Sequence, residues 1–245
     1  MIGMNENFIP KGRMRSPVRP RCAAARFHGR VVWRFACGLA ALLLPPVLSA
    51  QGDLASVMER LQQRYAAVTS LRAEFQQIYH GPGIDQKESG TVFLKKPGLM
   101  RWEYRDPEIK LFVADGRDTY LYIPADRQVL VRRVTAADLN STPLQFLLGR
   151  GDIRENFDPA WAPGTGTGGA LLFRLTPRSA DTDYAYVVIE CDSDQYDIRR
   201  MVIHERTGAT SEFVLSKVAT NVKMDRSQFQ FKIPKGVEVV RIDEK

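Results

Sequence analysis

Residues 89–122 read SGTVFLKKPGLMRWEYRDPEIKLFVADGRDTYLY, and this stretch indicates the fold more clearly than any other part of the chain. Its aromatic and β-branched residues form short runs separated by Lys-Pro-Gly, Asp-Pro and Asp-Gly turns, which is typical of antiparallel strands joined by tight connections. The runs contain more large apolar residues than one buried face needs. We therefore expect helices or an apolar ligand to cover part of this sheet.

Large apolar side chains recur at alternate positions of these strands, so each row points to a single face. Two interpretations of the rows remain open from the pattern alone. They fill an ordinary core, as most aromatic rows do, or they line a cavity for an apolar ligand. A register shift of one residue would exchange the whole set for its neighbours. The candidate cavity residues are Val92, Leu94, Met100, Trp102, Tyr104, Tyr120 and Tyr122.

The segments on both sides of this meander predict an α+β protein. Residues 54–68 place apolar residues at steps of three and four behind Asp53, a suitable N-cap, and so predict an amphipathic helix. Residues 135–148 predict two short helices, and residues 158–169 a Pro- and Gly-rich loop. Further strands are expected at 71–75, 170–176, 184–191, 201–205 and 211–218. The result is a strongly curved antiparallel sheet, with about three helices on one face acting as a lid.

Residues 1–50 are typical of a cleaved secretory signal. A basic region precedes the apolar run at 35–44, and two prolines and a few small residues follow it. A membrane anchor is the alternative, but spanning a bilayer takes about 20 apolar residues. A lipoprotein signal would need a Cys after the apolar run, whereas Cys37 stands at its start. We therefore expect a single exported domain over residues 51–245.

The leader also explains the charge of the chain. Its eight basic residues and one acidic residue account for the formal charge of +7, so the remainder is near neutral. The high isoelectric point is therefore no reason to expect nucleic-acid binding. Cys191 is the only Cys outside the leader, so no internal disulfide is expected. Its place at the end of an apolar strand predicts a buried, unreactive thiol.

The motifs that resemble catalytic or ligand sites lack the context that their chemistry needs. Residues 164–169 match G-x-G-x-x-G, but prolines precede them and a strand, not a helix, follows. Residues 192–197 resemble the start of a calcium loop without its glycine and glutamate. His80 and His204 have no partners at metal-ligand spacing. We expect no catalytic residue, no metal and no cofactor, and therefore not an enzyme.

Several short pieces of the sequence recur in the same order in one known family. Over residues 53–240, behind an export signal, the chain resembles the periplasmic outer-membrane lipoprotein carrier family, LolA. Each piece is weak alone, and the ordered set is specific. The pieces are Phe75-Gln-Gln, Ser89-Gly-Thr-Val-Phe-Leu-Lys-Lys-Pro-Gly, Met100-Arg-Trp-Glu-Tyr, Ala114-Asp-Gly, Tyr120-Leu-Tyr, Thr142-Pro-Leu and Phe229-Gln-Phe.

The resemblance implies an incomplete β-barrel with a helical lid over an apolar cavity. Family members take lipoproteins from an inner-membrane ABC transporter complex and hand them to an outer-membrane receptor. The resemblance thus implies a periplasmic monomer that binds lipoprotein acyl chains. Leu144, Phe146 and Leu147 would contribute to the cavity from the lid.

The resemblance also implies a latch for the lid at Lys96, the basic residue before the Pro of the Lys-Pro turn. Arg is usual there, and Lys departs from that pattern because its ammonium is a point donor and not a planar fork. Met100 stands at a family position that is often Phe. Three alternatives remain: a lipid- or lipoprotein-sensing envelope regulator of the same fold, an outer-membrane receptor, which would need a lipidated Cys, and an enzyme on a β scaffold.

Overall fold

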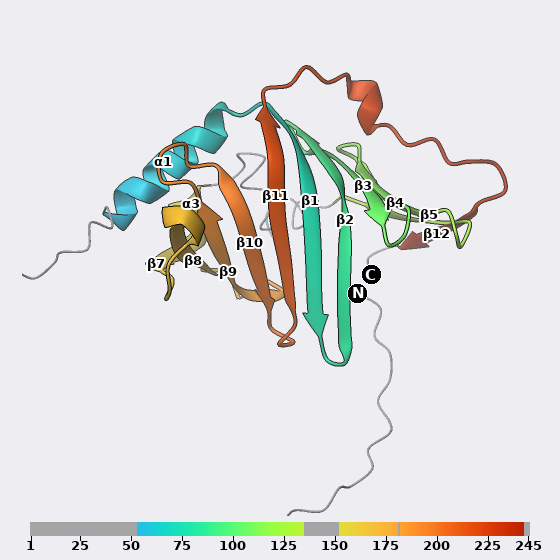
Figure 1. The fold of residues 1–245 in the computed structure, drawn as a ribbon. Helices are drawn as coiled ribbons and strands as arrows, with labels where there is room; N and C mark the ends of the chain where they lie inside the picture. Colours follow the sequence, from blue (N-terminus) through green and yellow to red (C-terminus); the bar gives the residue numbers. More distant parts are fainter. Residues whose placement is uncertain (1–52, 135–151, 181, 243–245) are drawn as a thin grey trace, which may run out of the picture. The chain divides into compact units, whose positions relative to one another are not determined.

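An open, curved sheet with few helices forms the part of the chain that the computed structural model describes, residues 53–134, 152–180 and 182–242 (Figure 1). The chain divides into two units, Met1–Leu48 and Ser49–Lys245, and every described residue belongs to the second. The expected signal segment and the expected helices at 135–148 therefore lie outside the described residues. The mostly-sheet α+β class agrees with the prediction.

The described strands form one sheet in the order β12-β6-β5-β4-β3-β2-β1-β11-β10-β9-β8-β7. All neighbours are antiparallel except β12 and β6, which run parallel. The five strands expected outside the meander are confirmed as β1 and β8 to β11. The strands are β1 (Ser70–Gly81), β2 (Ile84–Lys95), β3 (Leu99–Asp106), β4 (Lys110–Ala114), β5 (Asp118–Ile123), β6 (Gln128–Arg133), β7 (Phe157–Trp161), β8 (Leu171–Pro177), β9 (Tyr184–Cys191), β10 (Ile198–Glu205), β11 (Thr210–Thr220) and β12 (Glu238–Ile242).

The predicted amphipathic helix is confirmed as α1 (Leu54–Ala67), and the Asp53 carboxylate accepts a hydrogen bond from the Ala55 N–H at its first turn. Within the described residues the other helical segments are short, so the number of about three helices is not confirmed. They are α3 (Ile153–Asn156) and the 3₁₀ turns η2 (Thr167–Gly169) and η3 (Arg226–Phe229).

The prediction of a loop over residues 158–169 is wrong for its first part, because β7 pairs with β8 there. Pro159 suggested a loop, since Pro cannot donate to a strand ladder. β7 is the last strand in the sheet order, however, and an edge strand tolerates Pro. The glycine-rich remainder lies in the connection between β7 and β8, as expected.

The strand register defines two faces of the sheet. Trp102 pairs with Val92 on β2 and with Phe112 on β4, and residues paired in this way share a face. We call it the α1 face, because the buried side of α1 packs into the same core, with Leu61 fully buried. From α1 the core includes Val57, Met58, Leu61 and Tyr65, and from β8 to β11 it includes Phe173, Leu175, Val187, Ile189, Met201, Phe213 and Leu215.

The C-terminal segment covers part of the opposite face. It leaves the end of β11 and returns to the sheet at β12, next to β6 (Figure 1). Phe229 is fully buried and packs with Met224 against Leu99. The Lys95 ammonium donates to the Met224 carbonyl, and an Arg101 guanidinium nitrogen lies 3.2 Å from the Gln228 carbonyl oxygen. The C-terminal segment therefore covers part of the opposite face of β2 and β3.

Candidate functional site

Five of the seven candidate cavity residues lie on the α1 face. Val92, Leu94 and Trp102 are 0%, 1% and 4% exposed and belong to the central core. Met100 and Tyr104 are half-buried and pack against that core from its border. The alternation along β2 and β3 therefore predicted this part of the face correctly, while binding by these residues remains a prediction.

Trp102 lies at the centre of an aromatic cluster on this face. Its ring centroid is 4.8 Å from that of Phe75 and 5.7 Å from that of Phe213, both edge to face. Phe75 also contacts Tyr104, with centroids 5.1 Å apart. The sequence pattern missed Phe75 and Phe213, because β1 and β11 become neighbours only through the tertiary fold. Phe112 was missed as well, although its alternation within β4 could have indicated it.

The prediction that Tyr120 and Tyr122 share this face is wrong. Tyr120 pairs with Val113, which pairs with Arg101, and this row lies on the opposite face. Both tyrosine rings contact Phe231 of the C-terminal segment there, with centroids 5.5 and 5.6 Å apart. The Tyr-x-Tyr spacing correctly showed that the two share a face, but the β4–β5 connection decides which face. Leu121, paired with Phe112, takes their place on the α1 face.

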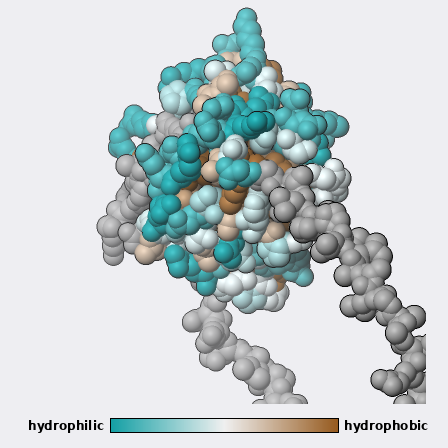
Figure 2. Space-filling model, turned by 90° about the vertical axis from the view of Figure 1, so that its left-hand side faces the viewer, coloured by the Kyte–Doolittle hydropathy of each residue, from teal (hydrophilic) through white to brown (hydrophobic). Residues whose placement is uncertain are grey.

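Apolar side chains on the α1 face are only partly covered by the described residues. On the side of this unit that Figure 2 shows, hydrophobic side chains gather at the centre and hydrophilic ones surround them. The expected lid residues Leu144, Phe146 and Leu147 lie outside the described residues. The half-buried residues against the core include Met100, Tyr104, Phe112, Trp161 and Ile203.

Lys96 contacts the C-terminal end of α1. Its ammonium nitrogen lies 2.9 Å from the Tyr65 carbonyl oxygen and 2.8 Å from that of Ala66. The last carbonyls of a helix have no partner within the helix and carry its negative end, so a cation is well placed there. Partial burial lowers the pKa of the Lys96 ammonium. In the described part of the chain, the carbonyls bound by Lys96 thus belong to α1.

Two further contacts hold the same end of α1 against the β9–β10 connection. The Arg64 guanidinium lies 2.8 Å from the Asp197 carboxylate. The Tyr65 hydroxyl accepts a hydrogen bond from the Ile198 N–H at 3.0 Å. These contacts hold the C-terminal end of α1, and among them the Lys96 contact connects it to the meander.

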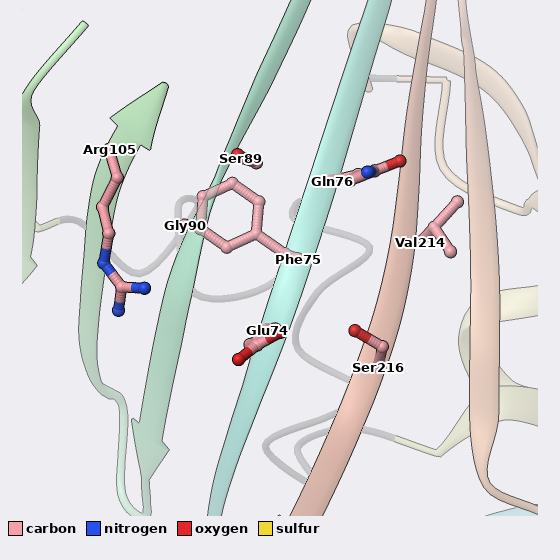
Figure 3. Close-up of a pocket in the computed structure, with 8 residues that line it drawn as sticks. All are labelled: Glu74, Phe75, Gln76, Ser89, Gly90, Arg105, Val214 and Ser216. Atoms are coloured by element: carbon pink, nitrogen blue, oxygen red, sulfur yellow. The ribbon is translucent and has the colours of Figure 1, made fainter. Parts of the chain in front are cut away.

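A pocket of about 450 Å³ lies on the opposite face, across β11, β1, β2 and β3. Figure 3 shows its side chains on these neighbouring strands, with Arg105 and Glu74 coming from β3 and β1. Five of its eight lining residues are polar and two of these are charged, so it suits hydrocarbon less well than the α1 face does. The lining residues are Glu74, Phe75, Gln76, Ser89, Gly90, Arg105, Val214 and Ser216.

Groups that could carry other chemistry are sparse in the described residues. They contain no set of three or more His, Cys, Asp or Glu side chains placed to hold a metal ion. Cys191 is buried as predicted, and burial raises the pKa of its thiol to about 12. No helix in the described ranges has both the length and the apolar character to cross a bilayer.

Comparison with known proteins identifies the family. The model of the family described as "Outer membrane lipoprotein carrier protein LolA" matches residues 66–232, more than half of the chain. The chain belongs to the LolA family. The predicted resemblance is thereby confirmed.

Named relatives of this LolA family member match most of its length. An outer-membrane lipoprotein carrier protein of Chromohalobacter salexigens is 33% identical over 212 residues, 85% of this chain and 96% of that protein. One from Methylobacillus flagellatus is 28% identical over 203 residues, 82% and 94% of the two chains. These names favour a carrier over a sensing regulator.

A solved structure supports the fold of this LolA family member. An uncharacterized conserved protein of Thermus thermophilus matches with a TM-score of 0.50 over 78% of this chain and 100% of that one. The sequences are 14% identical, so this likeness concerns the fold alone.

Proposed function

We propose that this protein is a periplasmic chaperone that binds the acyl chains of lipoproteins released from the inner membrane and delivers them to an outer-membrane receptor. The observation that carries the proposal is the partly covered apolar face around Trp102, which shares its core with α1, in a member of the lipoprotein carrier family. The acyl chains would contact Val92, Leu94, Met100, Trp102 and Tyr104, together with Phe112. The helices expected at 135–148, with Leu144, Phe146 and Leu147, would form the lid together with α1.

The physical need for such a carrier follows from the cost of exposing hydrocarbon to water. Each methylene buried is worth about 0.8 kcal/mol, so an acylated protein does not leave a membrane unaided at a useful rate. A soluble carrier must offer a replacement apolar surface, and it must also release its cargo. A lid that closes over the empty face competes with the acyl chains and thereby moderates their affinity.

This role requires no catalysis by the carrier itself. The sequence contains no G-x-x-x-x-G-K-[ST] motif for ATP binding, so the energy for loading would come from an ABC transporter in the inner membrane. We further propose that residues 1–50 are a cleaved export signal and that residues 51–245 act as a single, monomeric carrier domain. Export would place that domain between the two membranes, where it could reach both the transporter and the receptor.

Native mass spectrometry of residues 51–245 with a synthetic triacylated lipopeptide tests the proposal. We expect a complex of one protein and one lipopeptide, and no complex with the same peptide without its acyl chains. Unmodified lipopeptide should be recovered after release. Failure to form the complex, or chemical conversion of the lipopeptide, would contradict the carrier role.

A Lys96→Leu variant tests the latch. Without the contacts to the α1 carbonyls, the closed empty state loses stability, so bound cargo should be retained longer. Hydrogen bonds to charged groups contribute about 1.5–3 kcal/mol, which predicts release slowed on the order of tenfold. The measurement is transfer of a fluorescent lipopeptide from the protein to acceptor vesicles.

Lys95→Leu is the matched control, because Lys95 donates to Met224 on the opposite face. Its release rate should stay close to that of the original protein, and Lys96→Arg should retain a functional latch. Equal release rates for the Lys96→Leu and original proteins would exclude a latch at this residue.

A further inference from the structure

A buried ion pair interrupts the α1 face. The Lys110 ammonium contacts the Glu88 carboxylate, and their side chains are only 16% and 10% exposed. Glu88 also accepts a hydrogen bond from the Gln86 amide at 3.0 Å. Lys110 pairs with Tyr104 in the sheet register, and Glu88 with Gln77. Both charges therefore lie on the face that carries Trp102.

The pair lies where the aromatic cluster ends. The Tyr104 ring contacts Phe75 on one side, and the Lys110 ammonium lies 5.0 Å from its centroid. Burial, together with the charge of Glu88, raises the pKa of Tyr104, so its hydroxyl stays protonated and donates to the Gln77 amide oxygen at 3.2 Å. On β1 to β4 the face is thus apolar from the end near Lys96 as far as Tyr104, and the next positions along it, Gln77, Glu88 and Lys110, are polar.

A hydrocarbon chain gains nothing by extending over such a pair. Its methylenes offer no hydrogen bonds, and covering the charges removes the remaining water from them. A buried ion pair is also not required for stability, since apolar residues of similar volume often replace one at no cost. The position of this pair is therefore better explained by a boundary of the ligand surface than by a contribution to the stability of the fold.

We infer that Glu88 and Lys110 set the length of acyl chain that this face accepts. The inference rests on the proposed function and names a specificity determinant of the same site. Methylenes that lie between the Met100 end and Tyr104 are buried on apolar side chains. Those of a longer chain meet the charged pair and add no affinity.

The test is a series of peptides of one sequence, N-acylated with saturated chains from decanoyl to stearoyl and titrated below their micelle concentrations. For the original protein we expect the Kd to tighten about fourfold per methylene and then to level off. In a Glu88→Met, Lys110→Met double variant the levelling should move to longer chains. Its stearoyl peptide should bind at least about tenfold more tightly than in the original protein, with decanoyl binding unchanged.

Both charges are replaced together, because a single replacement would leave the other buried without its partner. A Glu74→Met, Lys217→Met double variant is the matched control. This pair, 2.9 Å apart and 42% and 75% exposed, lies on the opposite face, where Glu74 lines the pocket of Figure 3. Its length dependence should equal that of the original protein. Circular dichroism melts verify that each variant is folded.

Each outcome is decisive. Parallel length curves for the Glu88, Lys110 variant and the original protein would overturn the inference and leave the carrier function intact. If that variant does not fold, the length series on the original protein still tests the inference. A Kd that continues to tighten up to the stearoyl peptide without levelling off would overturn the inference. Failure of every acyl peptide to bind the original protein would contradict the proposed function itself.

Discussion

A Met100→Glu variant will remain folded and will bind a triacylated lipopeptide at least about tenfold more weakly than the original protein. Met100 is half-buried at the border of the core, so a carboxylate there stays hydrated while the face is empty. An acyl chain that packs on this position must remove that hydration, which costs several times the roughly 1.4 kcal/mol of a tenfold change. Isothermal titration gives the Kd. A charge introduced at Trp102 is less suitable as a test, because this side chain is only 4% exposed and its replacement would destabilise the fold as well as affect binding.

Tyr122→Glu is the matched control, with the same residue introduced on another strand of the meander. The strand pattern alone groups Tyr122 with Met100, whereas the register places it on the opposite face against Phe231. Lipopeptide binding by this variant should stay within about twofold of the original protein, with any loss confined to stability. Loss of binding in Tyr122→Glu but not in Met100→Glu would show that the cargo uses the other face.

A Gly90→Ala variant will lose about 3 kcal/mol or more of its free energy of unfolding. Gly90 lies at an irregularity between β2 and β3, where the two backbones come close together. A Cβ atom added there would lie 1.9 Å from the Glu103 carbonyl oxygen and 2.9 Å from a ring carbon of Phe75. The backbone cannot yield without separating the strands that carry Val92 and Trp102. Urea unfolding followed by tryptophan fluorescence measures the change.

Gly83→Ala provides the comparison for this substitution. Gly83 has a φ of 75° in the β1–β2 turn, and nothing lies within 4 Å of an added Cβ. The Gly83→Ala variant should therefore lose only about 1 kcal/mol of its free energy of unfolding, because alanine is less favourable than glycine in the left-handed conformation. Equal stability of the two variants would mean that the close approach at Gly90 does not exist in solution.

Local signals explain why much of the fold could be predicted. The turns Lys-Pro-Gly, Asp-Pro and Asp-Gly separate β2 to β5, and the helical spacing after Asp53 is that of α1. These patterns act within a few residues, so the sequence alone contains them. The prediction of a loop around Pro159 was wrong for the same reason. A strand accepts Pro where it lies at the edge of the sheet, and no local pattern reveals that β7 is an edge strand.

For the candidate site, the sequence could predict which residues of a single strand share a face, but not how the strands combine. Alternation placed Met100, Trp102 and Tyr104 together, since side chains two residues apart on a strand always share a face. Alternation did not show on which face Tyr120 and Tyr122 lie, because that depends on how the β4–β5 connection sets the register. Nor did it bring Phe213 to Trp102, since that contact needs the pairing of β1 with β11.

The sequence by itself therefore determined the strands of the meander, α1, the membership of the LolA family and the apolar row on β3. Only the tertiary structure decided that Phe75 and Phe213 enclose Trp102, that Lys96 reaches the carbonyls of α1, and that Glu88 and Lys110 close the row. Hydrophobic period is a property of neighbours along the chain. The face on which a strand's side chains lie, and the charged residues next to them, depend on the hydrogen-bonded pairing of that strand with its neighbours in the sheet.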